Sequence, residues 1–250
     1  MPETIFTSLL QYAITCGVLV VAQVVYVLFG FGSGIIAVGT LALLFPDLRD
    51  VVVMLLLVNL PAELGVVWSA RREIRWRPIA QLGVGVGLGI PLGTFFLRGW
   101  DLSLVLTALG WFLVAVGVLF LRLPSRERRR RPPTWLAAPT GLVSGTLTGL
   151  FGTGGPPVII WYHLLGVGKT AFRANLMTVF LLMSLVRVPS YLIGGLITVP
   201  RLWSTLAVLP AVLGGAWLGH RLHVTVSEKL FERLVSGLMV LLGLVLLLKI

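Results

Sequence analysis

The chain has 250 residues, of which 57% are hydrophobic and only 12% are charged. Soluble domains usually carry about 25% charged residues, and apolar runs of about 20 residues, enough to cross a bilayer core, recur along the whole chain. The composition therefore excludes a soluble globular protein. It predicts an all-α integral membrane protein with several spanning helices.

The positive charge of the chain is concentrated beside the apolar segments. The formal net charge is +11, and the arginines cluster in two short loops, RREIRWR at 71–77 and RLPSRERRRR at 122–131. Clusters next to membrane spans mark the cytoplasmic side and can contact anionic lipid headgroups. We therefore expect membrane lipid as a partner, and no nucleic acid, because the chain has no soluble domain to bind it.

In chain order, the first hydrophobic region covers residues 9–45 and contains the glycine-rich string GFGSG at 30–34. As one helix it would be about 55 Å long, too long for one span and short for two spans with a turn. We expect either a full helix followed by a shorter one or a broken helix with a re-entrant piece. Three simple spanning helices are predicted after it, at 51–70, 79–97 and 102–121.

The second half of the chain repeats this order. Residues 135–167 form another long hydrophobic region, interrupted by the string GLFGTGGPP at 149–157. Three simple spanning helices are predicted to follow, at 174–196, 203–221 and 230–248. We expect about 8–10 helical segments in the whole chain.

The two halves are related as an internal repeat. The string FGSG at 31–34 aligns with FGTG at 151–154 at an offset of 120 residues. A basic linker, 122–134, separates a first transmembrane repeat, 1–121, from a second, 135–250. Each repeat is thus predicted to be a broken helical region followed by three transmembrane helices.

A second match between the repeats lies in small residues spaced four apart. Three glycines between positions 85 and 93 align with an alanine and two glycines between 211 and 219, at an offset of 126. Small residues at this spacing let two helix backbones approach closely in lipid. We therefore expect each of these two helices to pack tightly against a neighbour.

The distribution of positive charge decides the orientation of the repeats only in part. Loops 71–77 and 122–131 are both interpreted as cytoplasmic. In the second half, Lys169 and Arg173 flank one loop, and a further group of basic residues flanks another: His220, Arg221, His223 and Lys229. If both of these loops lie on the cytoplasmic side, the second repeat has the inverted orientation in the membrane relative to the first. We favour inverted repeats, with parallel repeats as the alternative.

The glycine-rich breaks are the predicted binding site. A helix that begins near the bilayer midplane presents unpaired N–H groups and a partial positive charge, which favour an anion. Glycine permits close approach, and a Ser or Thr hydroxyl adds a donor. We predict a small anion held between the two breaks, the alternative being that the glycines serve only helix packing or a kink. The predicted substrate-binding residues of the breaks are Gly32, Ser33, Gly34, Gly152, Thr153, Gly154 and Gly155.

Polar residues inside the predicted spans are further candidates. Arg187 and Glu63 would each cost about 2.5–3.5 kcal/mol at a helix centre, so a partner or an aqueous cavity is expected. We predict that Arg187 supplies positive charge to an anion pathway and that Glu63 is its counter-ion or a proton carrier; the alternative is that both snorkel toward an interface. Asn175 is predicted to bind substrate and Asn59 to accompany Glu63, unless either amide only bonds a neighbouring helix.

No cofactor is expected. Three histidines and one cysteine, without carboxylates at ligand spacing, argue against a metal site. The absence of a glycine-lysine phosphate loop argues against ATP hydrolysis by this chain. His163, which follows the second break, is interpreted as an interfacial or structural group.

The string GFGSG, followed after a basic linker by SGTLTGLFGTGGPPVIIWY, resembles the TauE/SafE family of sulfite exporters, also called toluene sulfonate uptake permeases. The resemblance covers essentially the whole chain, and KTAFRAN at 169–175 is similar to an RAxN-like element of the family. The first break lacks the fuller triple glycine and following proline often seen there. The resemblance implies transport of small sulfur-containing or organic anions, such as sulfite, sulfonates or sulfoacetate, across the bacterial inner membrane.

The function predicted from these observations is secondary transport by alternating access around the breaks. An anion channel is the main alternative, because it could use the same breaks with a continuous wet path. An intramembrane enzyme is disfavoured, since the chain offers few candidates for a nucleophile and base. A homo-oligomer is left open.

Overall fold

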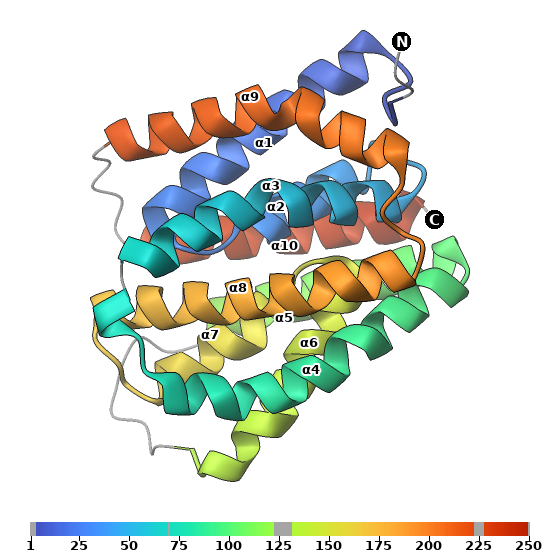
Figure 1. Ribbon diagram of the computed structural model, residues 1–250. Helices are drawn as coiled ribbons and strands as arrows, with labels where there is room; N and C mark the ends of the chain where they lie inside the picture. Colours follow the sequence, from blue (N-terminus) through green and yellow to red (C-terminus); the bar gives the residue numbers. More distant parts are fainter. Residues whose placement is uncertain (1–3, 70, 123–131, 223–227, 250) are drawn as a thin grey trace. The chain divides into compact units, whose positions relative to one another are not determined.

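The structure is a computed structural model that describes residues 4–69, 71–122, 132–222 and 228–249. The described part folds into α-helices joined by short turns, with no strand in it (Figure 1). Its ten α-helices are α1 (Leu9–Phe29), α2 (Ser33–Leu41), α3 (Leu48–Ser69), α4 (Trp76–Gly99), α5 (Leu102–Arg122), α6 (Ala137–Phe151), α7 (Gly155–Leu164), α8 (Lys169–Ile193), α9 (Val199–Arg221) and α10 (Glu228–Lys249).

The helices confirm the prediction of an all-α membrane protein. Each of the six simple spans coincides with one helix: α3, α4, α5, α8, α9 and α10. Within the described residues, six helical segments are long and apolar enough to cross a membrane, namely α1, α3, α4, α5, the part of α8 from residue 171, and α9. The inverted arrangement of the two repeats stays a prediction.

Each long hydrophobic region is a helix, a sharp turn and a shorter helix. In the first region α1 has 21 residues and α2 has nine. In the second region α6 has 15 residues and α7 has ten. The turns contain Gly30, Gly32 and Gly152 at φ values of 81°, 97° and 71°, a left-handed conformation that strongly favours glycine. Of the two arrangements expected from the sequence, the structure therefore has the helix followed by a shorter one.

The chain divides into two compact units, which are described separately. Unit 1 comprises Met1–Leu55, Trp100–Pro124 and Thr198–Ile250, and unit 2 comprises Leu56–Gly99 and Ser125–Ile197. Each unit contains helices from both halves of the sequence. The repeat boundary at the basic linker stays a prediction, because most of that linker (123–131), His223 and the side chains of Lys169 and Lys229 lie outside the described residues.

Unit 2 is built on a close pair of helices, α4 and α6. Three glycines of α4, Gly85, Gly89 and Gly93, lie against the backbone of α6, and the glycines of α6 lie against the backbone of α4, each with no room for a Cβ atom. The contacts advance together along both chains, so the helices run in the same direction. The close packing predicted for residues 85–93 is confirmed. The matching stripe on α6 consists of Gly141, Gly145 and Gly149.

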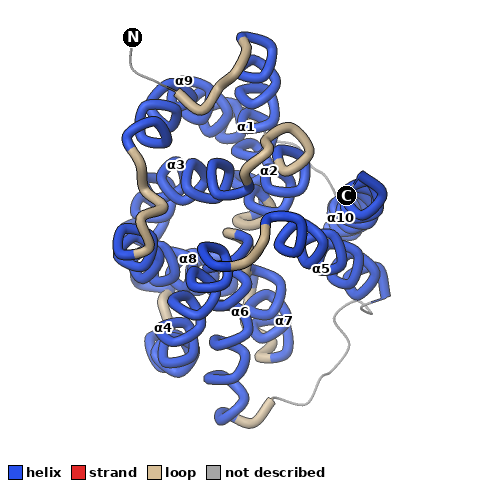
Figure 2. Tube along the Cα trace, turned by 90° about the vertical axis from the view of Figure 1, so that its right-hand side faces the viewer, coloured by secondary structure: helices blue, strands red, loops and turns tan. Residues whose placement is uncertain are grey.

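Unit 1 contains a similar pair, α1 and α9. A Cβ atom on Gly215 would lie 2.7 Å from the Val20 carbonyl oxygen, and one on Gly219 would lie 3.1 Å from the Val24 Cα. The predicted close packing of this helix is thus confirmed as well. The same unit holds α5 beside α10, which pack antiparallel through glycines on both helices (Figure 2).

A buried ion-pair cluster fixes the beginning of α9 to the beginning of α3 in unit 1. Arg201 Nε donates to Asp50 Oδ1 at 2.7 Å, and Arg201 Nη2 donates to Asp47 Oδ2 at 3.1 Å. The Arg201 side chain is only 11% exposed, against 18% for Asp50 and 33% for Asp47. The sequence alone does not reveal this cluster, because its ion pairs join positions about 150 residues apart.

Candidate functional site

The second break places the beginning of α7 inside unit 2. After α6 ends at Phe151, the left-handed Gly152 reverses the chain, and α7 starts at Gly155 with two prolines in its first turn. Proline suits this position, because the first N–H groups of a helix have no intrahelical acceptor. No side chain caps the N-terminus of α7. The predicted helix start at this break is therefore confirmed.

The break folds back against the helix that precedes it. The Ser144 hydroxyl of α6 donates to the Gly154 carbonyl, and the Thr148 hydroxyl donates to the Ser144 carbonyl at 2.8 Å. A Cβ atom on Gly154 would overlap both Ser144 and Thr148, and one on Gly155 would lie 3.2 Å from the Phe180 ring. Close packing is thus one reason for glycine at position 154.

The first break has the same construction in unit 1. The left-handed Gly30 and Gly32 turn the chain, and α2 begins at Ser33 with the Ile36 N–H donating to the Gly32 carbonyl. No side chain caps this N-terminus either. A helix start, an uncapped first turn and a hydroxyl residue therefore occur at both breaks.

The hydroxyl residues of the two breaks, Ser33 and Thr153, are both buried. Ser33 is 3% exposed and Thr153 is 6% exposed. A buried hydroxyl residue therefore lies beside each of the two helix starts. Substrate binding by the break residues stays a prediction.

Arg187 and Glu63 are both buried in unit 2, each only 4% exposed. The Arg187 guanidinium lies 4.7 Å from the centroid of the Tyr191 ring, and the Tyr191 hydroxyl donates to the Gly149 carbonyl at 2.9 Å. This contact connects Arg187 on α8 to the last turns of α6, just before the break. Burial of both side chains argues against snorkelling to an exposed interface. Asn59, one turn before Glu63 on α3, is half-buried.

Asn175 ties α8 to the segment that precedes α4. Its Oδ1 accepts from the Arg75 N–H at 2.7 Å, and its Nδ2 donates to the Ala171 carbonyl at 2.5 Å and to the Glu73 carbonyl at 3.4 Å. The side chain is fully buried. Both ends of the amide are therefore used by the protein itself, and the predicted contact of Asn175 with substrate has no support from this geometry.

Replacing Asn175 by leucine is expected to lower the free energy of unfolding by about 1–3 kcal/mol, because buried backbone groups lose their partners. Thermal unfolding of the purified protein in detergent measures the change. Met177→Leu, two residues on and equally buried, conserves volume and polarity and serves as the control. Unchanged stability of Asn175→Leu, together with weaker anion binding, would restore Asn175 to the substrate site.

Two aromatic residues of α7, Trp161 and Tyr162, carry buried polar atoms that the sequence did not single out. In an apolar run, Trp and Tyr are ordinary helix residues. Only their hydrogen-bond partners in the folded chain distinguish a packing role from a binding role. No sequence signal could have identified them.

Comparison with known proteins decides the family. A family model described as sulfite exporter TauE/SafE matches residues 15–246. The chain belongs to the TauE/SafE family. The predicted family and the prediction of a membrane transporter rather than an enzyme are thereby confirmed.

Two relatives of this TauE/SafE protein have been named for transport. The chain is 26% identical over 218 residues to "Probable sulfite/organosulfonate exporter TauE" of Cupriavidus necator, covering 86% of this chain and 85% of the relative. It is also 26% identical over 192 residues to "Probable inner membrane transporter protein TsaS" of Comamonas testosteroni, covering 76% of this chain and 80% of the relative. No solved structure matches the chain.

Proposed function

We propose that this protein is a secondary transporter of the bacterial inner membrane for small sulfur-containing or organic anions, such as sulfite, sulfonates or sulfoacetate. Its family and the names of both relatives support this class of substrate. The observation that carries the proposal at the level of residues is an uncapped helix start at each break with a buried hydroxyl residue, Ser33 or Thr153, beside it.

The chemistry of each break suits an oxyanion. The first N–H groups of a buried helix and the positive end of its dipole favour negative charge, and the adjacent hydroxyl adds one more donor. Together these groups replace water molecules that the anion loses on leaving solution. The buried Arg187 adds positive charge to unit 2 and favours an anion there, and Glu63 is the proposed counter-ion or proton carrier. That the two breaks bind one anion together, and that the repeats rock around it, stays a prediction from the sequence.

Thr153→Val and Ser33→Ala are expected to weaken anion binding about 10-fold or more, because each removes one hydrogen bond to a charged ligand. Calorimetric titration of the purified protein with sulfite, sulfate, sulfonates and short carboxylates measures the change. Thr178→Val is the matched control, since Thr178 is also buried but its hydroxyl donates to the Ala174 carbonyl of its own helix.

Wild-type protein that binds none of these anions would contradict the proposed function. Equal affinity of wild type, Thr153→Val and Ser33→Ala would remove the breaks from the site. Flux in liposomes separates transporter from channel, because a transporter gives slow, saturable exchange and a channel gives a high unitary current.

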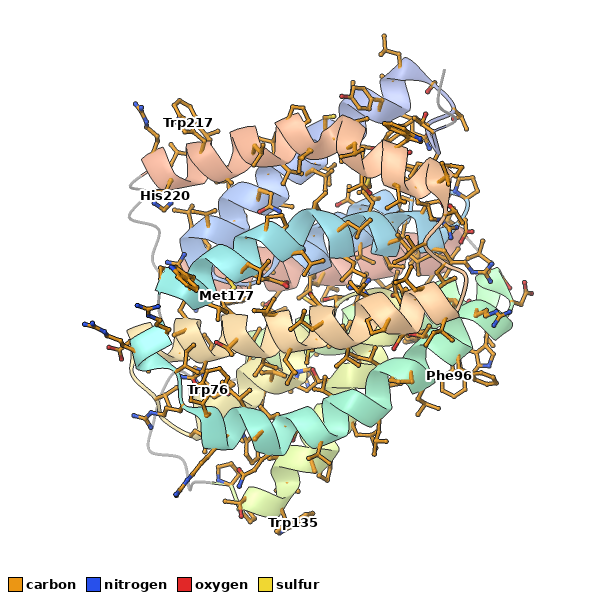
Figure 3. The ribbon with its side chains drawn as sticks, viewed as in Figure 1. Trp76, Phe96, Trp135, Met177, Trp217 and His220 are labelled. Atoms are coloured by element: carbon orange, nitrogen blue, oxygen red, sulfur yellow. The ribbon has the colours of Figure 1, made fainter. Side chains whose placement is uncertain are left out.

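The exposed basic loop of unit 2 is proposed to contact lipid headgroups. Arg71 lies 5.2 Å from the Trp68 ring centroid at the end of α3, and Trp76, 63% exposed, begins α4 (Figure 3). Exposed tryptophans and arginines at helix ends are typical of the membrane–water interface.

A further inference from the structure

Two buried hydrogen-bond donors on α7 have no acceptor. Trp161 is 4% exposed and Tyr162 is 1% exposed, and in the described parts of the chain neither Trp161 Nε1 nor Tyr162 Oη has a hydrogen-bond partner. Native proteins rarely leave such groups unpaired, because an unsatisfied buried donor is costly. The buried hydroxyls of Thr148 and Tyr191 in the same unit both have a partner. The two donors of α7 therefore call for a ligand that accepts hydrogen bonds.

Helical periodicity places both donors on the face of α7 that begins at the break. Residues 154, 158, 161 and 162 follow the spacing of one helix face, and all four are buried. Side chains on a helix lean toward its N-terminus, so the indole and the phenol project from the last turns back toward the glycines.

The ring of Tyr162 contacts the beginning of α8. It packs edge-on against Phe172, with 6.5 Å between ring centroids. The N-terminus of α8 has no side-chain cap and no acidic residue in its first turn, and Lys169 and Arg173 lie at sequence positions within its first five residues. Acidic residues are the usual choice where a helix dipole is positive. The positive end of the α8 dipole meets no carboxylate in that first turn, and it favours an anionic ligand near Tyr162.

We propose that Trp161 Nε1 and Tyr162 Oη bind an oxyanion of the transported class beside the junction of α7 and α8. This position lies about 10 Å along α7 from the break, at 1.5 Å per residue, and is a second binding position of the transport route. Two neutral donors suit a ligand with at least two acceptor oxygens, such as sulfite or the headgroup of a sulfonate. The aromatic rings supply apolar contact to the organic part of a sulfonate. The inference rests on the proposed function.

The test is calorimetric titration of the purified full-length protein in detergent with sodium sulfite and with sodium methanesulfonate, using sodium chloride as the control for ionic strength. Trp161→Phe and Tyr162→Phe keep an aromatic ring and remove one donor each. Each substitution is expected to raise the dissociation constant about 10-fold or more. The unfolding temperature of the ligand-free variants is expected to stay the same or rise, because an unpaired donor contributes nothing to the folded state.

Two control variants separate binding from folding. Trp135→Phe removes an indole that is 68% exposed and is expected to change neither affinity nor stability (Figure 3). Tyr191→Phe removes a hydroxyl that donates to the Gly149 carbonyl, and it is expected to lower the unfolding temperature of the ligand-free protein.

The outcomes distinguish this inference from the proposed function. If wild type binds an oxyanion and both α7 variants bind it equally well, only the inference fails. A fall in the ligand-free unfolding temperature like that of Tyr191→Phe would also overturn it, since the donors would then have a structural partner. If wild type binds neither anion, the proposed function fails for these substrates and the second binding position fails with it.

Discussion

Gly89→Ala is expected to lower the free energy of unfolding by about 2 kcal/mol or more, whereas Gly87→Ala, two residues away, is expected to be neutral or slightly stabilising. A Cβ atom on Gly89 would lie 2.8 Å from the Thr146 backbone nitrogen and 3.1 Å from the Gly145 carbonyl carbon, and it would overlap the Leu142 carbonyl oxygen. These are backbone atoms of α6, so no side-chain rotation can relieve the overlap.

Gly87 is a closely matched control, because it lies on the same helix and a Cβ atom there would meet nothing within 4 Å. Both substitutions change helix propensity and backbone entropy equally, so their difference isolates the contact between α4 and α6. Thermal unfolding in detergent and the yield of monodisperse protein measure the effect. Equal stability of the two variants would show that α4 and α6 do not pack through these glycines.

Arg201→Ala is expected to lower the free energy of unfolding by about 3 kcal/mol, because it leaves Asp47 and Asp50 without the cation that compensates their burial. This value is the lower end of the range for a buried pair, since a third of the Asp47 side chain is exposed. Lysine keeps the positive charge but lacks the planar guanidinium group that contacts both carboxylates. Arg201→Lys is therefore expected to be less stable than the wild type and more stable than Arg201→Ala.

Arg49→Ala is the control for this cluster. Arg49 lies 3.9 Å from Asp47 and its side chain is 30% exposed, so its loss is expected to change the unfolding free energy by less than about 1 kcal/mol. Chemical or thermal unfolding at low and high salt checks both values. If Arg201→Ala were no more destabilising than Arg49→Ala, the ion pairs of Arg201 would contribute no more to the free energy of unfolding than an exposed surface pair.

The helices and their breaks could be predicted from the sequence because both follow from local properties. The length of an apolar run decides whether a helix can span; glycine marks where a helix stops, as at Gly152, and proline suits the first turn of the next, as at Pro156. The glycine stripe at 85–93 likewise predicted close packing. It could not identify α6 as the neighbour, because the spacing of small residues on one helix carries no information about which other helix meets it.

Residues of the candidate site could be predicted only where their role follows from their neighbours in the sequence. Ser33 and Thr153 stand out because they lie inside the breaks. The amide of Asn175 is indistinguishable in the sequence from one that binds a ligand, and only the fold shows that Arg75, Ala171 and Glu73 occupy it. The same holds for α7, where the missing acceptors of its two aromatic donors become visible only in three dimensions.

The parallel pairs α1–α9 and α4–α6 each join a helix of the first half of the chain to a helix of the second half. During synthesis, α4 is therefore complete well before α6 exists. Most of the chain is likewise made after α1 and before its partner α9 emerges from the ribosome. Until then their packing faces meet lipid or the insertion machinery. Two separately expressed halves, cut within the basic linker, would each lack a partner helix in both units and would reach the native packing only by assembling with each other.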